Sequence, residues 1–459
     1  MALRVGQRDA AAREERSTHI KLMRSRRLYG LGAIICAALV VCSRSPSGLE
    51  GPYFVVPLAV AGVAYLIAIR EFLQVQQYPR HVIFACLALA VLWRIPFALM
   101  PSGPLDDVRR YVWDGRLQHL GYNPYTAIPA DPALGALHTT ETRGLNNPEV
   151  PSPYPPGAQL FFRSVTAIPR SAFAFRAAFI ACDLMIIAVL LAILDRTGQA
   201  EHWVLAYAWH PLLATDVAAS GHIDILGALL LLFSVAALSR HWRMAAAIAL
   251  GLAVAVKFLP IVVAPLYWRR VRIRDVILAA LVVGILYVPF FEHGHIPIGS
   301  LNVCVQRFRF NDPIFSGIER LWGAHVAAGF AVLAGLSTAV WLRIKQRELC
   351  WHAWAWPMAT SLVCGPVVYS WYLLWLLPFL RFLPTLPLML WSVSILSTYY
   401  VWHLHALAQP WQVPEWMTLA EYIPVVAAAA FVLRSSKRPD SDPKVNRKRH
   451  PYVGSEDLF

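Results

Sequence analysis

Charged residues are scarce in this sequence. Asp, Glu, Lys and Arg together make up only 15% of the 459 residues, whereas 58% are hydrophobic and the mean hydropathy is +0.50. Such a chain is too apolar for a soluble globular protein, and its apolar runs recur at the length that a helix needs to cross a bilayer. The composition therefore predicts an all-α polytopic membrane protein.

Paired cysteines and metal-ligand clusters are also missing. The seven cysteines occur singly, most of them inside apolar runs, with no Cys-x-x-Cys pair and no metal-ligand spacing. They are typical of small buried apolar groups, so no disulfide framework is expected. The chain shows no internal repeat and no separate soluble domain. These absences leave one continuous membrane domain as the expected architecture.

The basic residues do not indicate a nucleic-acid partner, although the formal net charge is +14. They gather at the two ends of the chain and in short turns between apolar runs. Orientation signals and contacts with anionic lipids explain basic residues in these places. Membrane lipids are therefore an expected partner, and nucleic acid is not.

The membrane topology can be predicted from the order of polar and apolar runs. We expect a basic cytoplasmic segment at 1–27, a single transmembrane domain at 28–433 and a basic, disordered cytoplasmic tail at 434–459. The domain should contain about 12 to 13 transmembrane helices plus a broken or re-entrant helix pair. Three spans precede the loop 101–170, which puts this loop and its short interfacial helices outside the plasma (inner) membrane, with both termini inside.

The broken pair is predicted at Met244–Trp268. This run is basic at both ends, with Arg243 before it and several arginines after it, and it carries Lys257 and Pro260 in its middle. Two half-helices that meet near Lys257 leave both basic ends on one side, with the proline at the break. A lysine inside a span costs about 3 kcal/mol and usually meets an anion in an internal cavity. A phosphate is one such anion; the alternative is a side chain that reaches the interface.

The loop after the third span is rich in acidic and basic residues. If it is helical, Asp107, Arg110 and Asp114 share a face, and Asp106 can pair with Arg110. A surface helix with ion pairs is one interpretation. The other is a catalytic base, because proline-containing turns further along the loop would fold it back towards the membrane. Partial desolvation there would raise the pKa of an acid towards the range that suits a general base.

Three further groups are ambiguous by themselves. His222 and Asp224, at the outer end of a span, are more typical of an interfacial hydrogen bond than of a metal site. Arg307 and Arg309 would either clamp a phosphate or lie in solvent. The aromatic run 369–375 is typical of an interfacial belt, although aromatic faces also stack on sugar rings.

Taken together, the motifs resemble those of a known enzyme family. They are Asp106-Asp107-x-x-Arg110-Tyr111-x-Trp113-Asp114-Gly115, Gly121-x-Asn123-Pro124-Tyr125, Tyr154-Pro155-Pro156, Trp209-His210-Pro211, Gly221-His222-x-Asp224, Lys257-Phe258-x-Pro260 and Trp371-Tyr372-x-x-Trp375. In this order the series resembles the multi-spanning C-type glycosyltransferases, in particular the polyprenol-phosphate-mannose-dependent enzymes of glycosyltransferase family 87. The resemblance covers most of the chain, from Asp106 to Pro378.

The resemblance implies a GT-C-like fold and a sugar donor carried on polyprenyl phosphate. It also implies transfer of a hexose, with mannose favoured, to a lipid, glycan or protein acceptor on the extracytoplasmic face. No nucleotide takes part in such a reaction, which agrees with the absence of a Gly-rich phosphate loop. A divalent cation such as Mg²⁺ or Mn²⁺ could assist, but the sequence contains no firm ligand cluster and we assign no metal site.

The residues and the resemblance give the same mechanism. Asp107 or Asp106 takes the proton of the acceptor hydroxyl, and Lys257, with Arg307 or Arg309, stabilises the departing phosphate. The remaining candidate substrate-binding residues are Arg110, Tyr111, Asp114, Asn123, Tyr125, Tyr154, His222, Asp224, Trp371 and Tyr372.

Two other functional classes remain open from the sequence. A transporter or flippase for a lipid-linked or anionic solute would also use an intramembrane lysine, a broken helix and charges on the outer face. Inverted repeats would favour it, and the sequence shows none. A scaffold protein would tolerate replacement of both Asp106 and Asp107.

Overall fold

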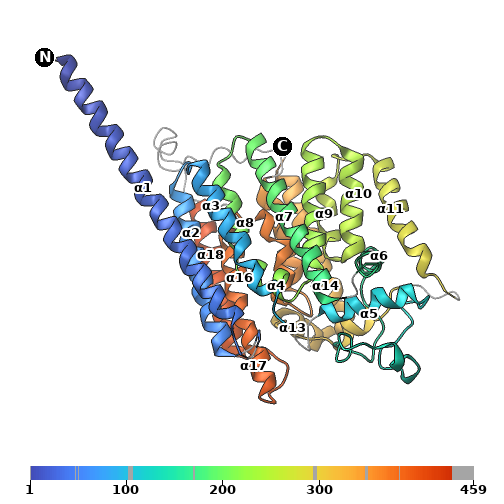
Figure 1. The fold of residues 1–459 in the computed structure, drawn as a ribbon. Helices are drawn as coiled ribbons and strands as arrows, with labels where there is room; N and C mark the ends of the chain where they lie inside the picture. The colour runs from blue at the N-terminus through green and yellow to red at the C-terminus, as the bar shows by residue number, and fades with distance from the viewer. Residues whose placement is uncertain are drawn as a thin grey trace.

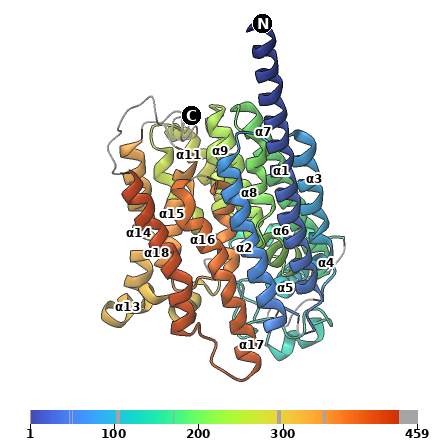
Figure 2. The ribbon, with the colours of Figure 1, turned by 90° about the vertical axis from the view of Figure 1, so that its left-hand side faces the viewer.

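The structure is a computed structural model, and it describes residues 2–46, 48–49, 51–101, 107–168, 171–292, 297–346, 350–381 and 383–436. The described part is a bundle of helices, with no strand longer than an isolated bridge such as Phe310–Val367 (Figures 1 and 2). The all-helical prediction is confirmed. Asp106 and the tail from residue 437 lie outside the described residues.

The helices of the first half are α1 Ala2–Ser43, α2 Pro52–Gln74, α3 Arg80–Leu92, α4 Arg94–Ala98, α5 Asp107–His119, η1 Pro132–Leu137, α6 Pro156–Val165, α7 Ala172–Arg196, η2 Glu201–Trp203, α8 Val204–Ala208, the π-helix η3 Leu213–Ala219, α9 Asp224–Ser239, α10 Arg243–Val256 and η4 Leu259–Tyr267. Those of the second half are α11 Ile273–Tyr287, η5 Val288–Phe290, α12 Leu301–Arg307, α13 Pro313–Trp322, α14 Ala324–Lys345, η6 Trp351–Trp354, α15 Trp356–Val363, η7 Ser370–Trp375, η8 Leu377–Phe379, η9 Leu383–Thr385, α16 Leu386–Ser394, η10 Ile395–Tyr399, α17 Tyr400–Ala406 and α18 Glu415–Ser436.

Seven helices of the described residues are long and apolar enough to cross a membrane, or up to eight if a bent pair is counted as one span. They are Leu22–Ser43, Pro52–Gln74, Arg80–Ala98, Ala172–Arg196, Ile273–Phe290, Ala324–Lys345 and Glu415–Ser435, and the bent pair is η3 with α9. The protein is therefore multi-spanning. The count is lower than the 12 to 13 predicted because several apolar runs are divided into short helices, as α16, η10 and α17 divide the run after residue 385.

One of these divisions separates α8 from η3. Helix α8 ends at Ala208, and Pro211 prevents its direct continuation because proline has no amide hydrogen. The His210 ring then accepts a hydrogen bond from the backbone N–H of Leu212 and also bonds Ser392 Oγ at 2.9 Å. Irregular backbone is stable at membrane depth only when its polar groups are satisfied in this way.

The predicted break at Lys257 is confirmed. Helix α10 ends at Val256, and Lys257 is extended (φ −157°, ψ 142°). Ser234 Oγ, near the end of α9, bonds both the Ala246 carbonyl at the start of α10 and the Tyr267 hydroxyl at the end of η4. The two ends of the segment therefore lie at the same level, and α10 with η4 forms a hairpin whose tip is Lys257.

Helices α1, α2 and α3 alternate in direction, so that α5 lies across the end of the bundle opposite to the start of α1 (Figure 1). The end of α18 points to the same end of the bundle as the start of α1 (Figure 2). A buried ion pair ties the interior together: Arg94 Nε lies 2.6 Å from Asp183 Oδ2, and the Tyr207 hydroxyl donates to Asp183 Oδ1. These contacts link α4, α7 and α8.

Candidate active site

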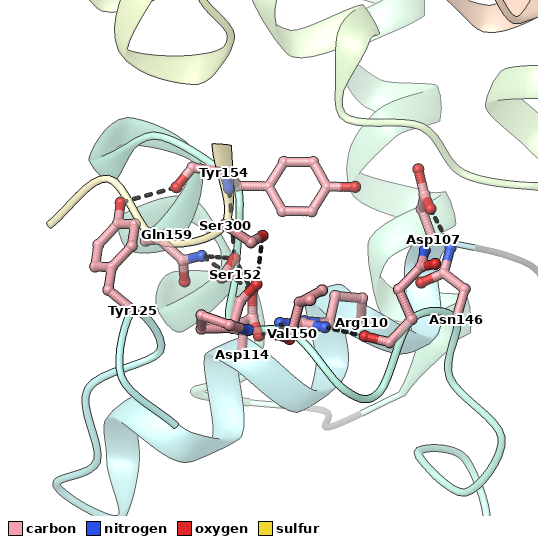
Figure 3. Close-up of polar contacts among 12 residues, drawn as sticks. Asp107, Arg110, Asp114, Tyr125, Asn146, Val150, Ser152, Tyr154, Gln159 and Ser300 are labelled. Carbon is pink, nitrogen blue, oxygen red and sulfur yellow. Dashed lines mark hydrogen bonds and ion pairs between the residues drawn. The ribbon is translucent and has the colours of Figure 1, made fainter. Parts of the chain in front are cut away.

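Helix α5 begins at Asp107, where a carboxylate is favoured by the helix dipole. Its Oδ1 accepts a 2.6 Å hydrogen bond from Asn146 Nδ2, and its Oδ2 lies 3.5 Å from His222 Nδ1. The side chain keeps 19% of its surface exposed. Asp107 therefore joins the loop that carries Asn146 to the turn before α9, while part of its carboxylate stays accessible (Figure 3).

The environment of Asp107 corrects the expectation of a raised pKa. Burial does raise the pKa of this carboxyl, but the contact with His222, the hydrogen bond from Asn146 and the charge of Lys257 together lower it further, so that it lies below its ordinary value. Asp107 is therefore held as a carboxylate, which is the form that accepts a proton.

Asp114, two turns further along α5, is closed off. Its Oδ1 bonds Arg110 Nε at 3.0 Å, and its Oδ2 accepts hydrogen bonds from Ser152 Oγ and Gln159 Nε2. Arg110 in turn donates to the Val150 carbonyl at 2.9 Å. Figure 3 shows this cluster beneath the loop that carries Ser152. Arg110 and Asp114 thus hold the loop onto α5.

The turn at Asn123 has a similar structural role. Asn123 Oδ1 accepts from the Tyr125 backbone N–H, and its Nδ2 donates to the Phe290 carbonyl at 2.9 Å. The Tyr125 hydroxyl donates to the Tyr154 carbonyl at 2.8 Å. These bonds join the loop to η5, which follows α11, and leave the Tyr154 ring to point towards Asp107 (Figure 3).

Tyr111 and Tyr154 line the same space from α5 and from the loop before α6. Their rings meet edge to face with centroids 5.2 Å apart, and the Tyr111 hydroxyl accepts from the Ile223 backbone N–H at 3.4 Å. Burial raises the pKa of both phenols, and the negative charge of Asp107 raises it further. Both hydroxyls therefore stay protonated and can donate hydrogen bonds.

Lys257 faces the interior, as predicted, and the anion it meets is Asp224. Its Nζ lies 2.7 Å from Asp224 Oδ1 and 3.7 Å from the centroid of the Tyr372 ring. Trp375 Nε1 donates to the same carboxylate oxygen at 2.7 Å. Asp224 is buried, whereas the lysine side chain is 23% exposed. Asp224 thus accepts from one of the three ammonium donors, and the Tyr372 ring lies against the same group.

The aromatic run 369–375 is not an interfacial belt. Trp371 is stacked between His222 (centroids 3.9 Å apart) and Tyr369 (4.3 Å), so both of its faces are covered. Trp375 has no exposed surface. The run forms the 3-10 helix η7, which packs inside the bundle because its side chains contact η3, α9 and the hairpin tip rather than lipid headgroups.

Arg307 and Arg309, in the segment between α11 and α13, lie apart from these groups. Arg309 is engaged by Glu319, with Nε 2.8 Å from Oε2, and it also donates to the Val305 carbonyl. Arg307 is exposed at the end of α12. Among the described residues, no hydrogen bond or ion pair joins either arginine to Asp107 or Lys257. Lys257, by contrast, lies close enough to Asp107 for its charge to lower the pKa of that carboxyl.

The described residues contain no group of three or more His, Cys, Asp or Glu side chains that could hold a metal ion. Asp107 and His222 contact each other, and the Asp224 carboxylate is held by Lys257 and Trp375. This donor set does not fit Mg²⁺ or Mn²⁺, so the mechanism below contains no step at a metal.

Several residues of the site were missed at the sequence level. Asn146, Ser152 and Gln159 lie in or after a polar loop, and nothing in their spacing links them to α5. Asp216 is different, because an acid inside an apolar run is itself a signal. Its carboxylate accepts from Ser370 Oγ and the Tyr399 hydroxyl, and its carbonyl accepts from the His222 backbone N–H at 2.9 Å.

Comparisons with known proteins identify the family. The chain is similar to a solved structure titled crystal structure of ArnT from Cupriavidus metallidurans bound to undecaprenyl phosphate, with a TM-score of 0.43 and 13% identity over 77% of this chain and 74% of that one. No curated protein matches the chain. Residues 32–271, more than half of the chain, match the family described as alpha-(1->6)-mannopyranosyltransferase, N-terminal domain. This match favours an enzyme over a transporter or a scaffold. The chain belongs to the alpha-(1->6)-mannopyranosyltransferase family and is a membrane glycosyltransferase.

Proposed function

We propose that this protein transfers mannose from a polyprenyl-phosphate donor to a hydroxyl of a lipid, glycan or protein acceptor, with Asp107 as the general base and Lys257 as the ligand of the donor phosphate. One observation supports this most strongly. A partly exposed carboxylate on α5 and a partly exposed ammonium at the hairpin tip lie close enough for the charge of Lys257 to lower the pKa of Asp107. A base and a phosphate ligand must be neighbours in this way.

In the reaction, the acceptor hydroxyl gives its proton to the Asp107 carboxylate as its oxygen forms a bond to the anomeric carbon. The bond between that carbon and the phosphate oxygen breaks, and its electron pair leaves with polyprenyl phosphate. A positioned general base typically contributes about 10²- to 10⁴-fold to such a step. Asn146 and His222 hold the carboxylate in place from both oxygens.

Lys257 stabilises the charge that develops on the phosphate. Asp224 fixes Nζ through one contact, and the Tyr372 ring lies against it. Removal of one preorganised donor from such a site typically costs about 10²- to 10³-fold in rate. Arg307 and Arg309 are secondary candidates for this role. Arg309 is engaged by Glu319, and no hydrogen bond or ion pair joins Arg307 to Lys257 or Asp107 among the described residues.

The geometry favours a single displacement. A double displacement needs a second free carboxylate next to the anomeric carbon. Among the described residues, Asp224 is a candidate beside Lys257, but it is buried and held by Lys257 and Trp375. A single displacement inverts the anomeric centre, so an α-mannoside product requires a β-linked donor.

We place the reaction on the extracytoplasmic side of the plasma membrane, with both termini in the cytoplasm. The support is the distribution of basic residues: Arg24, Arg26 and Arg27 lie in the first two turns of the first candidate span, and Arg269 and Arg270 follow the hairpin. Positive residues of short turns favour the cytoplasmic side. Helix α5 lies at the opposite end of the bundle (Figure 1).

The test is transfer of radiolabelled mannose in proteoliposomes, with polyprenyl-phosphate mannose and nucleotide-linked mannose offered separately. We expect transfer from the lipid-linked donor alone. Lys257→Met should raise the donor KM and lower kcat, whereas Arg307→Met should change neither strongly. Transfer from the nucleotide donor without lipid carrier, or an unchanged donor KM in Lys257→Met, would contradict the proposal.

A further inference from the structure

Helix η7 contacts both halves of the candidate site. Four of its six residues each meet a different partner, all of them in η3, α9, the turn between these or the hairpin tip. Ser370 Oγ donates to Asp216, Trp371 stacks on His222, Tyr372 lies against Lys257 Nζ, and Trp375 Nε1 donates to Asp224. A single rigid turn therefore touches the neighbour of the base and the neighbour of the phosphate ligand.

We propose that η7 is the positioning element of this enzyme: Trp375 orients Lys257 through Asp224, Trp371 orients Asp107 through His222, and the spacing between base and phosphate ligand follows from the spacing of these two tryptophans. The inference rests on the function proposed above for Asp107 and Lys257. It adds residues that touch neither substrate and that act only through others.

The contact with Asp224 is specific. Trp375 Nε1 and Lys257 Nζ both bond Asp224 Oδ1, each at 2.7 Å. Without the indole N–H, this oxygen keeps only the lysine, and the carboxylate loses the bond that fixes its rotation. A buried carboxylate depends strongly on such partners. The lysine head would then lose its fixed position at the hairpin tip.

Gly227 allows Trp375 to make this bond. It lies three residues after Asp224 on the same face of α9. A Cβ at Gly227 would lie 1.9 Å from the indole ring of Trp375, far inside any real contact. The indole fits against α9 only because no side chain is present. Gly227 therefore supports the hydrogen bond between Trp375 and Asp224 indirectly, because it leaves space for the indole ring.

The contact with His222 works by stacking. The His222 and Trp371 rings are nearly parallel, with an angle of 8° between their planes, and Tyr369 covers the other face of Trp371. This stack keeps His222 Nδ1 towards Asp107 Oδ2. If the stack loosens, His222 can turn away, and one of the contacts that keep Asp107 ionised is lost.

Groups other than His222 also influence the pKa of Asp107, and a shift of this pKa in a variant could come from any of them. The charged and titratable groups whose interaction with this carboxylate is resolved are His222, Lys257, Tyr111, Tyr154, Cys304, Tyr369 and Tyr372. Of these, Trp371 contacts His222, Tyr369 and Tyr372 directly. The phenols stay neutral over the working range, so an effect of Trp371 on titration passes through His222.

The experiment compares Trp375→Phe, Gly227→Ala and Trp371→Phe with the wild type in proteoliposomes, with donor concentration and pH varied. Trp209→Phe is the matched control, because its buried indole N–H donates to the Cys86 carbonyl at 3.0 Å, away from the site. All four variants remove or displace one buried indole contact. Folded protein is quantified for each, so that general destabilisation is separated from kinetic effects.

We expect Trp375→Phe and Gly227→Ala to raise the donor KM about 10-fold or more, with no shift of the pH profile. Trp371→Phe should move the acid limb of kcat/KM to higher pH with an unchanged donor KM. Gly227→Ala should add little to Trp375→Phe, because both act on one contact. Trp209→Phe should change only the amount of folded protein.

If both η7 variants behave like Trp209→Phe, or if they show the same mixed defect, η7 is packing only and the inference is wrong. Measurements on the wild type and on Asp107→Asn distinguish this failure from a failure of the proposed function. If the wild type transfers mannose, Asp107→Asn does not, and the η7 substitutions have no effect, only the positioning role of η7 is wrong. Absence of transfer from any polyprenyl-phosphate donor removes both.

Discussion

Asp107 and Asp114 lie two turns apart on the same face of α5, yet they have opposite environments. Asp114 is buried and has three side-chain partners, Arg110, Ser152 and Gln159. Asp107 has Asn146 on one oxygen and His222 near the other, and it stays partly exposed beside Lys257. Asp114 is therefore closed to a substrate, whereas Asp107 is accessible to one. Two acids of one motif can therefore do different work.

The difference comes from the loop 142–155 and the start of α6. The loop returns over α5 and supplies Asn146 to one acid and Ser152 to the other, and α6 adds Gln159 to the second. Arg110 binds the carbonyl of Val150 in the same loop. The order of charges along α5 carries no information about this return path. The comparison shows that the exposure of an acid, more than its place in a charged motif, identifies the candidate base.

The largest expected effect is on activity at Asp107. Asp107→Asn keeps the size of the side chain but removes the proton acceptor, so we expect transfer to fall by about 10²- to 10⁴-fold. The thermal unfolding midpoint in detergent should stay close to that of the wild type, because the carboxylate is only partly buried. Steady-state transfer and thermal unfolding of the same preparations check this. If Asp107→Asn keeps most of the wild-type activity, Asp107 is not the general base and its contrast with Asp114 has no catalytic meaning.

Asp114→Asn should show the reverse pattern. The substitution leaves the buried Arg110 guanidinium without its counter-charge, and breaking a buried pair costs about 3 to 5 kcal/mol. We expect a clear drop in the unfolding midpoint and in the yield of folded protein. Activity per folded molecule should remain within a few-fold of the wild type. A large loss of activity in stable protein would place Asp114 in the chemistry instead.

A smaller effect concerns pH. The hydrogen bond from Asn146 lowers the pKa of Asp107, while burial raises it. Asn146→Ala removes the first influence and leaves the second, so the pKa of Asp107 rises and the acid limb of kcat/KM moves to higher pH. The pH–rate profile measures this directly. Gln118→Ala, which removes another buried amide of the same region, should leave the acid limb in place.

The smallest effect is expected at Arg309. Its partners are Glu319 and nearby carbonyls, and both side chains of the pair are partly exposed. Such a pair contributes about 1 kcal/mol or less. Arg309→Met should therefore lower stability slightly and leave the donor KM unchanged, in contrast to Lys257→Met. Titration of the donor with both variants checks the difference, and a raised KM in Arg309→Met would return this arginine to the phosphate site.

The sequence predicted those features that depend on local rules. The break at Lys257 could be predicted because basic residues at both ends of a run and a proline in its middle leave few arrangements. The shared face of Asp107, Arg110 and Asp114 follows from helical spacing once the segment is taken as a helix.

Features that depend on tertiary contacts could not be predicted. The sign of the pKa shift of Asp107 depends on Asn146 and His222, which are 39 and 115 residues away in the chain. The role of η7 depends on Gly227 leaving room for Trp375. The described residues contain fewer long apolar helices than the predicted number of spans, because hydropathy does not show where a buried run divides into short helices, as it does at Pro211.

The most direct test of the central claim is a single-turnover measurement on the Asp107→Asn protein with the lipid-linked mannose donor already bound. Donor occupancy and transfer to the acceptor are followed in the same sample, beside the wild type. We predict full occupancy, because Lys257 and its neighbours are intact, and transfer slowed by about 10²-fold or more. If the Asp107→Asn protein transfers mannose from the bound donor at the wild-type rate, Asp107 is not the base and the account is contradicted.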